Sequence, residues 1–491
     1  MPSRKDELNA YTFAKRRTLA AFVQPSATGT EENAPRPLRA VLPGLITGAL
    51  ILAGFGAWGM LRPAVPEGWD EPGRNLILGS DSTTRYVVLE TGGQRQLHPV
   101  LNLASARLLL DPSTFGIVSV DDAELDNGDI PRGPTLGIPY APDRLPAPDD
   151  AGQEKPWAAC QRPAGDGGGT QGATFLFDTD EAHLVGGPSR LTGGEALYVR
   201  APADDGEFTD YLVDATGTKY ALAETGDDGE LLRRVLLGDA EPQPVTAEWL
   251  DTLRTGSPIR FPDLPGETGA PADVPGLDPE AAVVGTVLTA PTGSGPQHYV
   301  VYPDAVVPVS DFTARLLLGS PEAAVLGQNG EALRVGAQDV SPAPDSLSPD
   351  AENDWPTHAT TPVGGNRTTL CSVLLGVDPE DGSPRLATWA APDYPAPIAN
   401  ESASAYVTPG SGLLYRQVTG EQAEAGTVYL VTDTGLRHGV QSTAAGEESD
   451  DARTRLGYGD VTPVPVPAEW SQLLPTGPRL DTESARQPQG A

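Results

Sequence analysis

The sequence is poor in cysteine, histidine and positive charge. Two cysteines and five histidines occur in 491 residues, and the histidines show no ligand spacing, so we predict no metal site. Lys and Arg number 33 against 67 Asp and Glu, which gives a formal net charge of −34. Because phosphate binding needs clustered Lys and Arg, nucleic acid is excluded as a partner.

The sequence also lacks the motifs of common catalytic sites. It contains no GxxxxGK[ST] phosphate-binding loop and no GxSxG nucleophile elbow. The segment 167–172 (GGGTQG) matches GxGxxG, but no strand precedes it and no helix follows, so we interpret it as a Gly-rich loop. We therefore predict no catalytic residue, and no cofactor is evident.

Long apolar runs are absent except for one. Residues 40–61 (AVLPGLITGALILAGFGAWGML) carry no charge, and as a helix they are long enough to span ~30 Å of hydrocarbon. The run is longer than a typical signal-peptide core, so a retained anchor is favoured over a cleaved signal peptide. Basic residues precede it and acidic residues follow it, which places the N-terminus in the cytoplasm and the bulk outside.

The basic segment before the anchor, residues 1–39, predicts an amphipathic helix over Asp6–Val23. Lys15, Arg16 and Arg17 would then contact anionic membrane lipid or a cytosolic partner. The alternative is a solvated tail that merely satisfies the positive-inside rule. The helix prediction rests on four apolar residues at roughly helical spacing: Leu8, Tyr11, Leu19 and Phe22.

Glycine and proline, by contrast, are abundant, at 56 and 50 residues. They are spread between short apolar runs, which indicates turns in a β-rich α+β protein, and the length predicts two or more packing units. The motif [ST]-A-R-L-L-L occurs at Ser105–Leu110 and Thr313–Leu318, each time after a strand-like segment (Tyr86–Glu90 and His298–Tyr302).

A second pair of segments repeats at similar spacing. YLVDATGTKY (Tyr211–Tyr220) matches YLVTDTGLRH (Tyr429–His438), and EALYVR (Glu195–Arg200) matches GLLYRQ (Gly412–Gln417). Each half closes on Pro-x-x-Ala-Glu-Trp, in which Trp249 or Trp470 should anchor a helix on a sheet. The extracytoplasmic region is therefore an internal duplication of two unit types.

The first [ST]-A-R-L-L-L unit predicts a short helix after its strand. Leu97, Val100, Leu101, Ala104 and Leu108 recur at helical spacing, with Pro99 in the first turn. The arginines of the motif, Arg107 and Arg315, are either functional cations or, more in keeping with such positions, caps for local carbonyls or partners of Asp.

The two cysteines, Cys160 and Cys371, are 211 residues apart in the sequence. This separation is close to the offset between the repeated segments of the two halves. A single pair outside the cytoplasm predicts a disulfide, and buried free thiols are the alternative. If a pseudo-two-fold axis relates the halves, equivalent positions meet only near that axis. We therefore predict that Cys160 and Cys371 join the halves at the centre.

Several of these segments together resemble the EccB family, the membrane-anchored core component of the actinobacterial type VII secretion system. They are YTFAKRR at Tyr11–Arg17, HPVLNLASARLLL from His98, PRGPTLGIPYAPDRLP at Pro131–Pro146, WAAC at Trp157–Cys160 and the four repeats. The resemblance covers essentially the whole chain. It implies four repeat domains around a central β core, an oligomer within a larger complex, and EccC, EccD and EccE as partners. The family has also been described as ATPases, which implies ATP as a ligand without placing it on any residue.

Three functions remain open: a structural subunit of a secretion machine, an ectoenzyme that hydrolyses nucleotides, and a module that binds cell-wall peptidoglycan. The absence of paired catalytic groups favours the first. The expected boundaries are a cytoplasmic segment (1–39), the anchor (40–61), a linker with repeat 1 (62–135), the first half of the core (136–204), repeat 2 (205–265), repeat 3 (285–340), the second half of the core (341–420), repeat 4 (421–480) and a flexible tail (481–491).

Overall fold

The computed structural model describes residues 3–23, 38–61, 65–165, 169–203, 206–293, 295–398, 404–420, 426–440 and 452–489. Gly167 and Gly168 of the Gly-rich segment, the linker 62–64 and residues 490–491 lie outside these ranges. The fold is mixed α/β, with one apolar helix near the N-terminus and five small mixed sheets.

The N-terminal region consists of two helices, α1 (Arg4–Val23) and α2 (Leu38–Leu61). Within α2, Val41–Trp58 is long and apolar enough to cross a membrane, the one such stretch in the described part of the chain. A helix satisfies its own backbone hydrogen bonds, which is why an uncharged run of this length adopts that conformation in lipid.

Four of the five sheets share one strand order. Each unit begins with a strand, continues through an antiparallel hairpin, passes through a helix, and ends in a strand that pairs in parallel with the first. We keep the names repeat 1 to repeat 4 for these units. Repeat 1 consists of β1 (Asn75–Gly79), β2 (Arg85–Thr91), β3 (Gln94–Pro99), α3 (Leu103–Leu109) and β4 (Gly116–Val120), followed by α4 (Asp122–Leu125).

The other three repeats follow the same plan. Repeat 2 contains β7 (Glu195–Pro202), β8 (Phe208–Val213), β9 (Thr218–Ala221), α6 (Gly226–Leu237) and β10 (Gln243–Pro244), with β11 (Arg254–Thr255) beside β9. Repeat 3 contains β12 (Val287–Thr292), β13 (Gly295–Val301), β14 (Val306–Val309), α8 (Asp311–Gly319), α9 (Ala323–Leu326) and β15 (Leu333–Arg334). Repeat 4 contains β20 (Gly412–Val418), β21 (Val428–Thr432), β22 (Arg437–Gly439), α10 (Ala452–Leu456) and β23 (Val464–Pro467).

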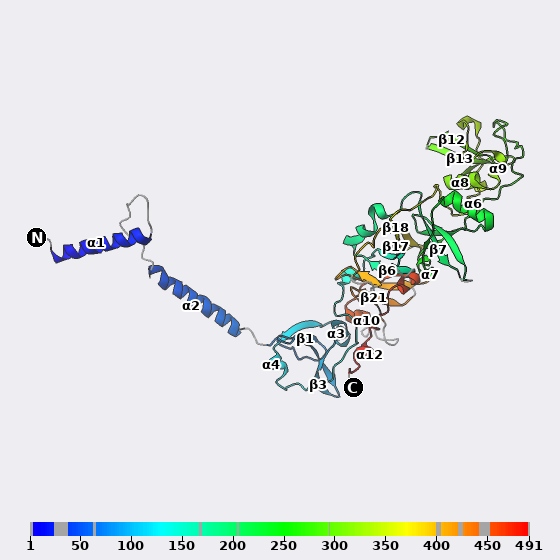
Figure 1. Ribbon diagram of the computed structural model, residues 1–491. Helices are drawn as coiled ribbons and strands as arrows, with labels where there is room; N and C mark the ends of the chain where they lie inside the picture. The colour runs from blue at the N-terminus through cyan, green and yellow to red at the C-terminus, as the bar shows by residue number, and fades with distance from the viewer. Residues whose placement is uncertain are drawn as a thin grey trace.

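The fifth sheet is built from both halves of the chain, in the order β18-β17-β5-β6-β19. Its strands are β5 (Trp157–Pro163), β6 (Thr170–Leu176), β17 (Thr369–Val377), β18 (Pro384–Ala391) and β19 (Ala405–Val407). It lies between repeats 2 and 4, with repeat 3 at the end farthest from repeat 1 (Figure 1). The remaining short elements are α5 (Pro148–Ala151), η1 (Thr179–Val185), η2 (Gly187–Ser189), α7 (Ala247–Leu250), η3 (Ala337–Asp339), η4 (Asp345–Leu347), β16 (Thr361–Pro362), α11 (Ala468–Gln472) and α12 (Thr482–Ala485).

This arrangement differs from the sequence-based expectations at several points. Two types of repeat unit were expected, but the structure has a single type, because all four repeats have the same strand order. EALYVR and GLLYRQ, which were assigned to the core, form β7 and β20, the first strands of repeats 2 and 4. A flexible tail was expected from residue 481, whereas Asp481–Gln489 contains α12 and contacts repeat 1.

The helix that follows the third strand of repeat 1 begins later than its apolar spacing suggests. Leu97 and Pro99 lie in β3, where Pro99 pairs with Tyr86 of β2. The helix α3 starts only at Leu103, because the side chain of Asn102 accepts a hydrogen bond from the Ser105 N–H and caps it. The prediction of a helix starting near Leu97 is therefore wrong, since β-pairing competes with the helical pattern.

The two tryptophans of the repeated Ala-Glu-Trp segment pack against the central sheet. Trp249 in α7 and Trp470 in α11 are both buried, in one cluster with Trp157 of β5 and Leu370 of β17. The Trp249 indole donates a hydrogen bond of 2.8 Å to the Ala159 carbonyl. Each tryptophan therefore attaches its repeat to the core, as the sequence predicted for a sheet-anchored helix.

Candidate functional site

The two cysteines form a disulfide in the middle of the central sheet. Cys160 on β5 and Cys371 on β17 are paired directly across antiparallel strands, with an S–S distance of 2.04 Å. Both are buried, at 1% and 0% exposure, in a cluster with Phe175 and Trp389. The predicted disulfide is confirmed, and it links the two halves of the chain across the sheet that both halves build.

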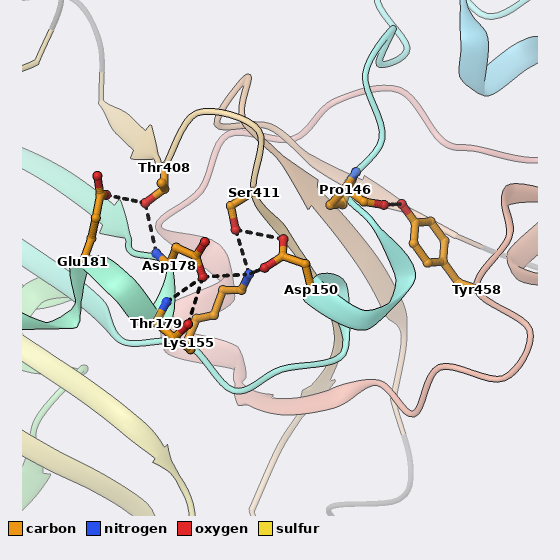
Figure 2. A network of polar contacts seen from close by, with 9 residues as sticks. All are labelled: Pro146, Asp150, Lys155, Asp178, Thr179, Glu181, Thr408, Ser411 and Tyr458. Carbon is orange, nitrogen blue, oxygen red and sulfur yellow. Dashed lines mark hydrogen bonds and ion pairs between the residues drawn. The ribbon is translucent and has the colours of Figure 1, made fainter.

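A buried lysine joins the two halves a second time (Figure 2). The Lys155 side chain is fully buried, pairs with the Asp150 carboxylate, and lies 3.7 Å from Oδ1 of Asp178. Its ammonium also donates to Ser411 Oγ at 2.7 Å, and that hydroxyl donates to Asp150 at 3.0 Å. A buried charge is tolerated only when it is paired and hydrogen-bonded, so this polar network holds α5 against the segment before β20.

The polar network continues through the neighbouring hydroxyl and carboxyl groups (Figure 2). The Thr408 hydroxyl donates to Glu181 at 2.6 Å and accepts from the Asp178 N–H at 2.9 Å. The Tyr458 hydroxyl of repeat 4 donates to the Pro146 carbonyl at 2.8 Å. The sequence analysis did not single out these residues, because carboxylates are frequent throughout so acidic a chain. An Asp-rich segment that also contains a lone lysine was the available signal.

The two [ST]-A-R-L-L-L arginines occupy matching junctions between repeats. Arg107 of repeat 1 donates to the Leu456 carbonyl of repeat 4 at 3.1 Å. Arg315 of repeat 3 donates to the Thr360 carbonyl at 2.5 Å, in the segment before β16, which pairs with β7 of repeat 2. Partial burial lowers the pKa of Arg315. Both arginines therefore cap carbonyls, which confirms the structural interpretation over a functional cation.

Two histidines occupy matching positions in repeats 1 and 4. His98 on β3 and His438 on β22 are buried, and their Nδ1 atoms contact the carbonyls of Pro134 (3.0 Å) and Pro478 (2.9 Å). Each ring lies against a glycine, Gly133 or Gly477, that leaves no room for a Cβ. Burial lowers the pKa of His438, so its ring is held in the neutral form. Such rings are core residues rather than ligands.

The basic residues proposed to contact the membrane lie on α1. Lys15, Arg16 and Arg17 are exposed, and no described residue forms an ion pair with them. The helix forms as predicted, but its polar and apolar residues are poorly segregated. At 3.6 residues per turn, Lys15 falls within the stripe of Leu8, Tyr11, Leu19 and Phe22, and Phe13 lies on the opposite side.

The described residues bring no catalytic constellation together. No group of three or more His, Cys, Asp or Glu side chains that could hold a metal gathers in the ranges that the structure covers. Contrary to the sequence-based expectation, a strand does precede the Gly-rich segment, since β5 ends at Pro163. The described part of the segment leads into β6, and no helix N-terminus follows it. A phosphate-binding loop would need that helix. A hollow of about 500 Å³ beside α8 is lined by His298, Asp311 and Arg315 among others.

One apolar helix followed by four like units around a disulfide-linked sheet defines the class: a repeat protein with a helix long enough to cross a membrane. The family described as "Type VII secretion system ESX-1, transport TM domain B" matches residues 1–491, and the chain belongs to this EccB family. The resemblance stated from the sequence is thereby confirmed.

Curated relatives match along nearly the full chain. The ESX-1 secretion system ATPase EccB1 of Mycolicibacterium smegmatis (strain MKD8) is 27% identical, over 98% of this chain and 94% of its own length. The ESX-5 secretion system ATPase EccB5 of Mycobacterium marinum is 28% identical, over 98% and 93%.

Solved structures share the fold. A chain of an intact ESX-5 inner membrane complex matches with a TM-score of 0.57 and 22% identity, over 100% of this chain and 96% of that one. The EccB3 dimer from the ESX-3 core complex matches with a TM-score of 0.59 and 24% identity, over 84% and 99%.

Proposed function

We propose that this protein is a structural core subunit of a type VII secretion membrane complex. It is anchored by α2 with its N-terminus in the cytoplasm, and its four repeats form extracytoplasmic docking surfaces as two halves related by a pseudo-two-fold axis. The observation that supports this most is the duplicated core, in which the disulfide and the Lys155 network tie both halves of the chain into one scaffold. EccC, EccD and EccE type components are the proposed partners.

Co-purification tests this function. The full chain is solubilised from membranes in mild detergent with a C-terminal tag, and the co-purifying membrane components are identified by mass spectrometry. We expect the three partner components in reproducible ratios. A matched variant lacking residues 1–23 shows whether α1 contributes to the assembly. Recovery of the tagged chain alone under conditions that keep other membrane complexes intact would overturn the proposal.

The proposed topology has its own test. A reporter that is active only outside the cytoplasm, fused after Ala491, should be active, because the basic residues precede α2 and the repeats follow it. The same reporter placed before Arg4 should be silent. Activity of a cytoplasmic reporter after Ala491 would reverse the orientation.

Contact of α1 with anionic lipid is a further part of the proposal. A peptide of residues 3–23 should bind vesicles that contain anionic lipid and leave neutral vesicles unbound. Changing Lys15, Arg16 and Arg17 to Gln should weaken binding by about 100-fold, since each basic residue near such a surface contributes about 1 kcal/mol. Equal binding of both peptides would leave a cytosolic protein as the partner of this segment.

Nucleotide hydrolysis is the second candidate, because the matching relatives are named ATPases. The purified full chain is assayed for ATP turnover with and without Mg²⁺. Turnover that survives further purification would replace the structural role with an enzymatic one. Peptidoglycan binding, the third candidate, is tested by pull-down on insoluble cell wall, and no binding would remove it.

A further inference from the structure

The basic cluster of α1 is followed directly by a threonine to which the proposed function gives no role. Lys15–Arg17 are three consecutive basic residues, and Thr18 comes next. The other hydroxyl residues in the described part of the chain before α2, Ser3 and Thr12, have no basic residue at the positions directly before them. Protein kinases that select substrates by charge recognise basic side chains close to the acceptor hydroxyl. Thr18 therefore has the sequence context of a phosphorylation site.

The Thr18 side chain is accessible to such an enzyme. It is exposed, and its hydroxyl donates a hydrogen bond of 2.8 Å to the Ala14 carbonyl, one turn earlier in the same helix. All the described side chains of α1 except that of Ala20 are exposed. Since most helical stability in proteins comes from packing, a helix with so little of it opens readily when it leaves a surface. The segment can then adopt the extended conformation in which a kinase binds its substrate.

Thr18 also lies on the same side of α1 as two large aromatic residues. At 3.6 residues per turn, it falls within about 40° of both Tyr11 and Phe22 around the helix axis. These two side chains are 70% and 91% exposed, so this is a side that α1 would bury against lipid. A phosphate on Thr18 would have to enter the same apolar layer. Because a charged group is costly to transfer out of water, the phosphate opposes burial of this side.

The phosphate would also cancel most of the positive charge of α1. The helix carries five basic and two acidic residues, which gives it a net charge of +3. A phosphothreonine adds about two negative charges near neutral pH, and Lys15, three residues earlier, is placed to pair with it. The net charge then falls to about +1. Each elementary charge near an anionic surface changes the binding constant about fivefold, so two charges should weaken lipid contact about 25-fold.

We propose that Thr18 is the acceptor of a protein kinase and that its phosphorylation releases α1 from the membrane. This proposal rests on the proposed contact of α1 with anionic lipid and on the cytoplasmic position of the N-terminus. The Thr18 oxygen attacks the γ-phosphorus of Mg²⁺-bound ATP, the bond to the β-phosphate oxygen breaks, and ADP leaves. The hydroxyl proton passes to a carboxylate of the kinase. α1 is thereby a switchable contact, while α2 keeps the chain anchored.

The first experiment looks for the phosphate on the full chain. The protein is purified from membranes of the cells that encode it, in exponential and in stationary growth. Cleavage after glutamate leaves residues 8–31 as one peptide, which contains both Thr12 and Thr18. Mass spectrometry should place a phosphate on Thr18 and none on Thr12. Absence of the Thr18 phosphate from both samples would overturn the proposal.

The second experiment asks whether the basic cluster directs the kinase. Membranes of the same cells that contain the full chain are incubated with γ-labelled ATP and Mg²⁺, and the label on the chain is measured. Thr18→Ala should remove the label, and Thr12→Ala should leave it unchanged. Arg16→Gln/Arg17→Gln should lower it at least tenfold. Because this double variant binds anionic lipid more weakly, its acceptor is more accessible, and lost label reports recognition. Equal labelling of the double variant would contradict the proposal.

The third experiment measures the release itself, by hydrogen exchange of residues 4–23 in the full chain reconstituted in bilayers. In anionic lipid, Thr18→Glu adds one negative charge and should speed exchange about fivefold relative to Thr18→Gln, which has a similar size and no charge. In neutral lipid the two variants should exchange alike.

The wild-type chain separates the two ways in which this experiment can fail. If anionic lipid slows exchange of wild-type α1 but the two variants exchange equally there, the release is overturned and the lipid contact stands. If anionic lipid does not slow exchange of wild-type α1, the lipid contact fails and this proposal fails with it. The assembly role is tested independently by co-purification.

Discussion

The inner junction, between repeats 1 and 4, and the outer junction, between repeats 2 and 3, are built from the same parts but are closed differently. At the inner junction the arginines are reciprocal: Arg107 donates to the Leu456 carbonyl, and Arg455 donates to the Leu110 carbonyl at 2.8 Å. At the outer junction Phe312 of α8 meets Trp355 with ring centroids 6.2 Å apart. Arg315 caps one carbonyl there, and the hollow of about 500 Å³ lies beside it.

The C-terminal segment is the strap that closes the inner junction. After repeat 4 the chain crosses back to repeat 1, where the Gln489 N–H donates to the Thr135 carbonyl at 2.8 Å and Pro488 bridges to Leu136. Leu480 and Ala485 are fully buried in the shared inner cluster. Segments that leave repeats 2 and 3 close the outer junction too: Ile259 and Phe261 are buried in one cluster with Phe312, and the Trp355 indole donates a hydrogen bond of 3.2 Å to the Pro258 carbonyl. One repeat unit therefore gives two closed joints with different contacts, one nearer the anchor helix and one at the far end (Figure 1).

The largest expected effect comes from breaking the link between the two ends. Cys160→Ser or Cys371→Ser opens a bridge with a sequence separation of 211 residues. The chain-entropy model gives about 5 kcal/mol for such a loop, and natural bridges typically contribute 2–5 kcal/mol. Both variants should show a similarly lowered Tm, with individual repeats still folded by circular dichroism. Free reaction of both native thiols with maleimide in unreduced wild-type protein would contradict this.

Removing the strap should open the inner junction and leave the outer junction closed. Truncation after Arg479 deletes buried Leu480 and Ala485, and loss of one fully buried leucine alone costs about 2–5 kcal/mol. Hydrogen exchange of α3 and α10 should rise, whereas that of α6 and α8 should stay unchanged. Truncation after Gln489, which removes only the last two residues, is the control. Unchanged protection of α3 would show that the strap is not what closes the joint.

A matched pair of core substitutions compares the junctions directly. Leu108 and Leu316 occupy the same position of the two [ST]-A-R-L-L-L motifs, and each is 0% exposed. Their replacement by Ala should cost about 3 kcal/mol in each case. Each leucine lies in a junction cluster that a following segment also closes, so the two losses of stability should be similar. The free energy of unfolding is measured by denaturant titration. A loss confined to one of the two variants would show that the two junctions contribute unequally.

The smallest effect is a pH dependence confined to the inner end. Burial lowers the pKa of His438 below its unfolded value of about 6.5, so the unfolded chain binds the extra proton first. The contribution of neutral His438 to the free energy of unfolding is complete above a pH of about 6.5. It decreases as the pH falls from there toward the pKa of His438 in the folded state. His438→Gln should flatten the dependence of Tm on pH between 5 and 6.5. A slope equal to that of wild type would show that His438 does not cause it.

Local sequence was enough to predict several features of the molecule. The uncharged run 40–61 could only be a spanning helix or a signal, and α2 covers it. The paired segments indicated a duplication, and the two cysteines at matching positions gave the bridge that the structure confirms. These features depend on composition and internal similarity, which a linear sequence contains in full.

Other features were decided by tertiary contacts. Leu97 and Pro99 fit a helical pattern yet form a strand, because β2 offers them backbone partners. Similar segments show that repeats are alike but not which repeat docks on which, so the pairing of 1 with 4 and of 2 with 3 could not be read from them. Lys155 can be buried only because the fold brings Asp150, Asp178 and Ser411 around its ammonium group, since an unpaired buried charge would be too costly. The sequence determined the units and their covalent link, whereas the close packing of each junction decided where one unit holds another firmly.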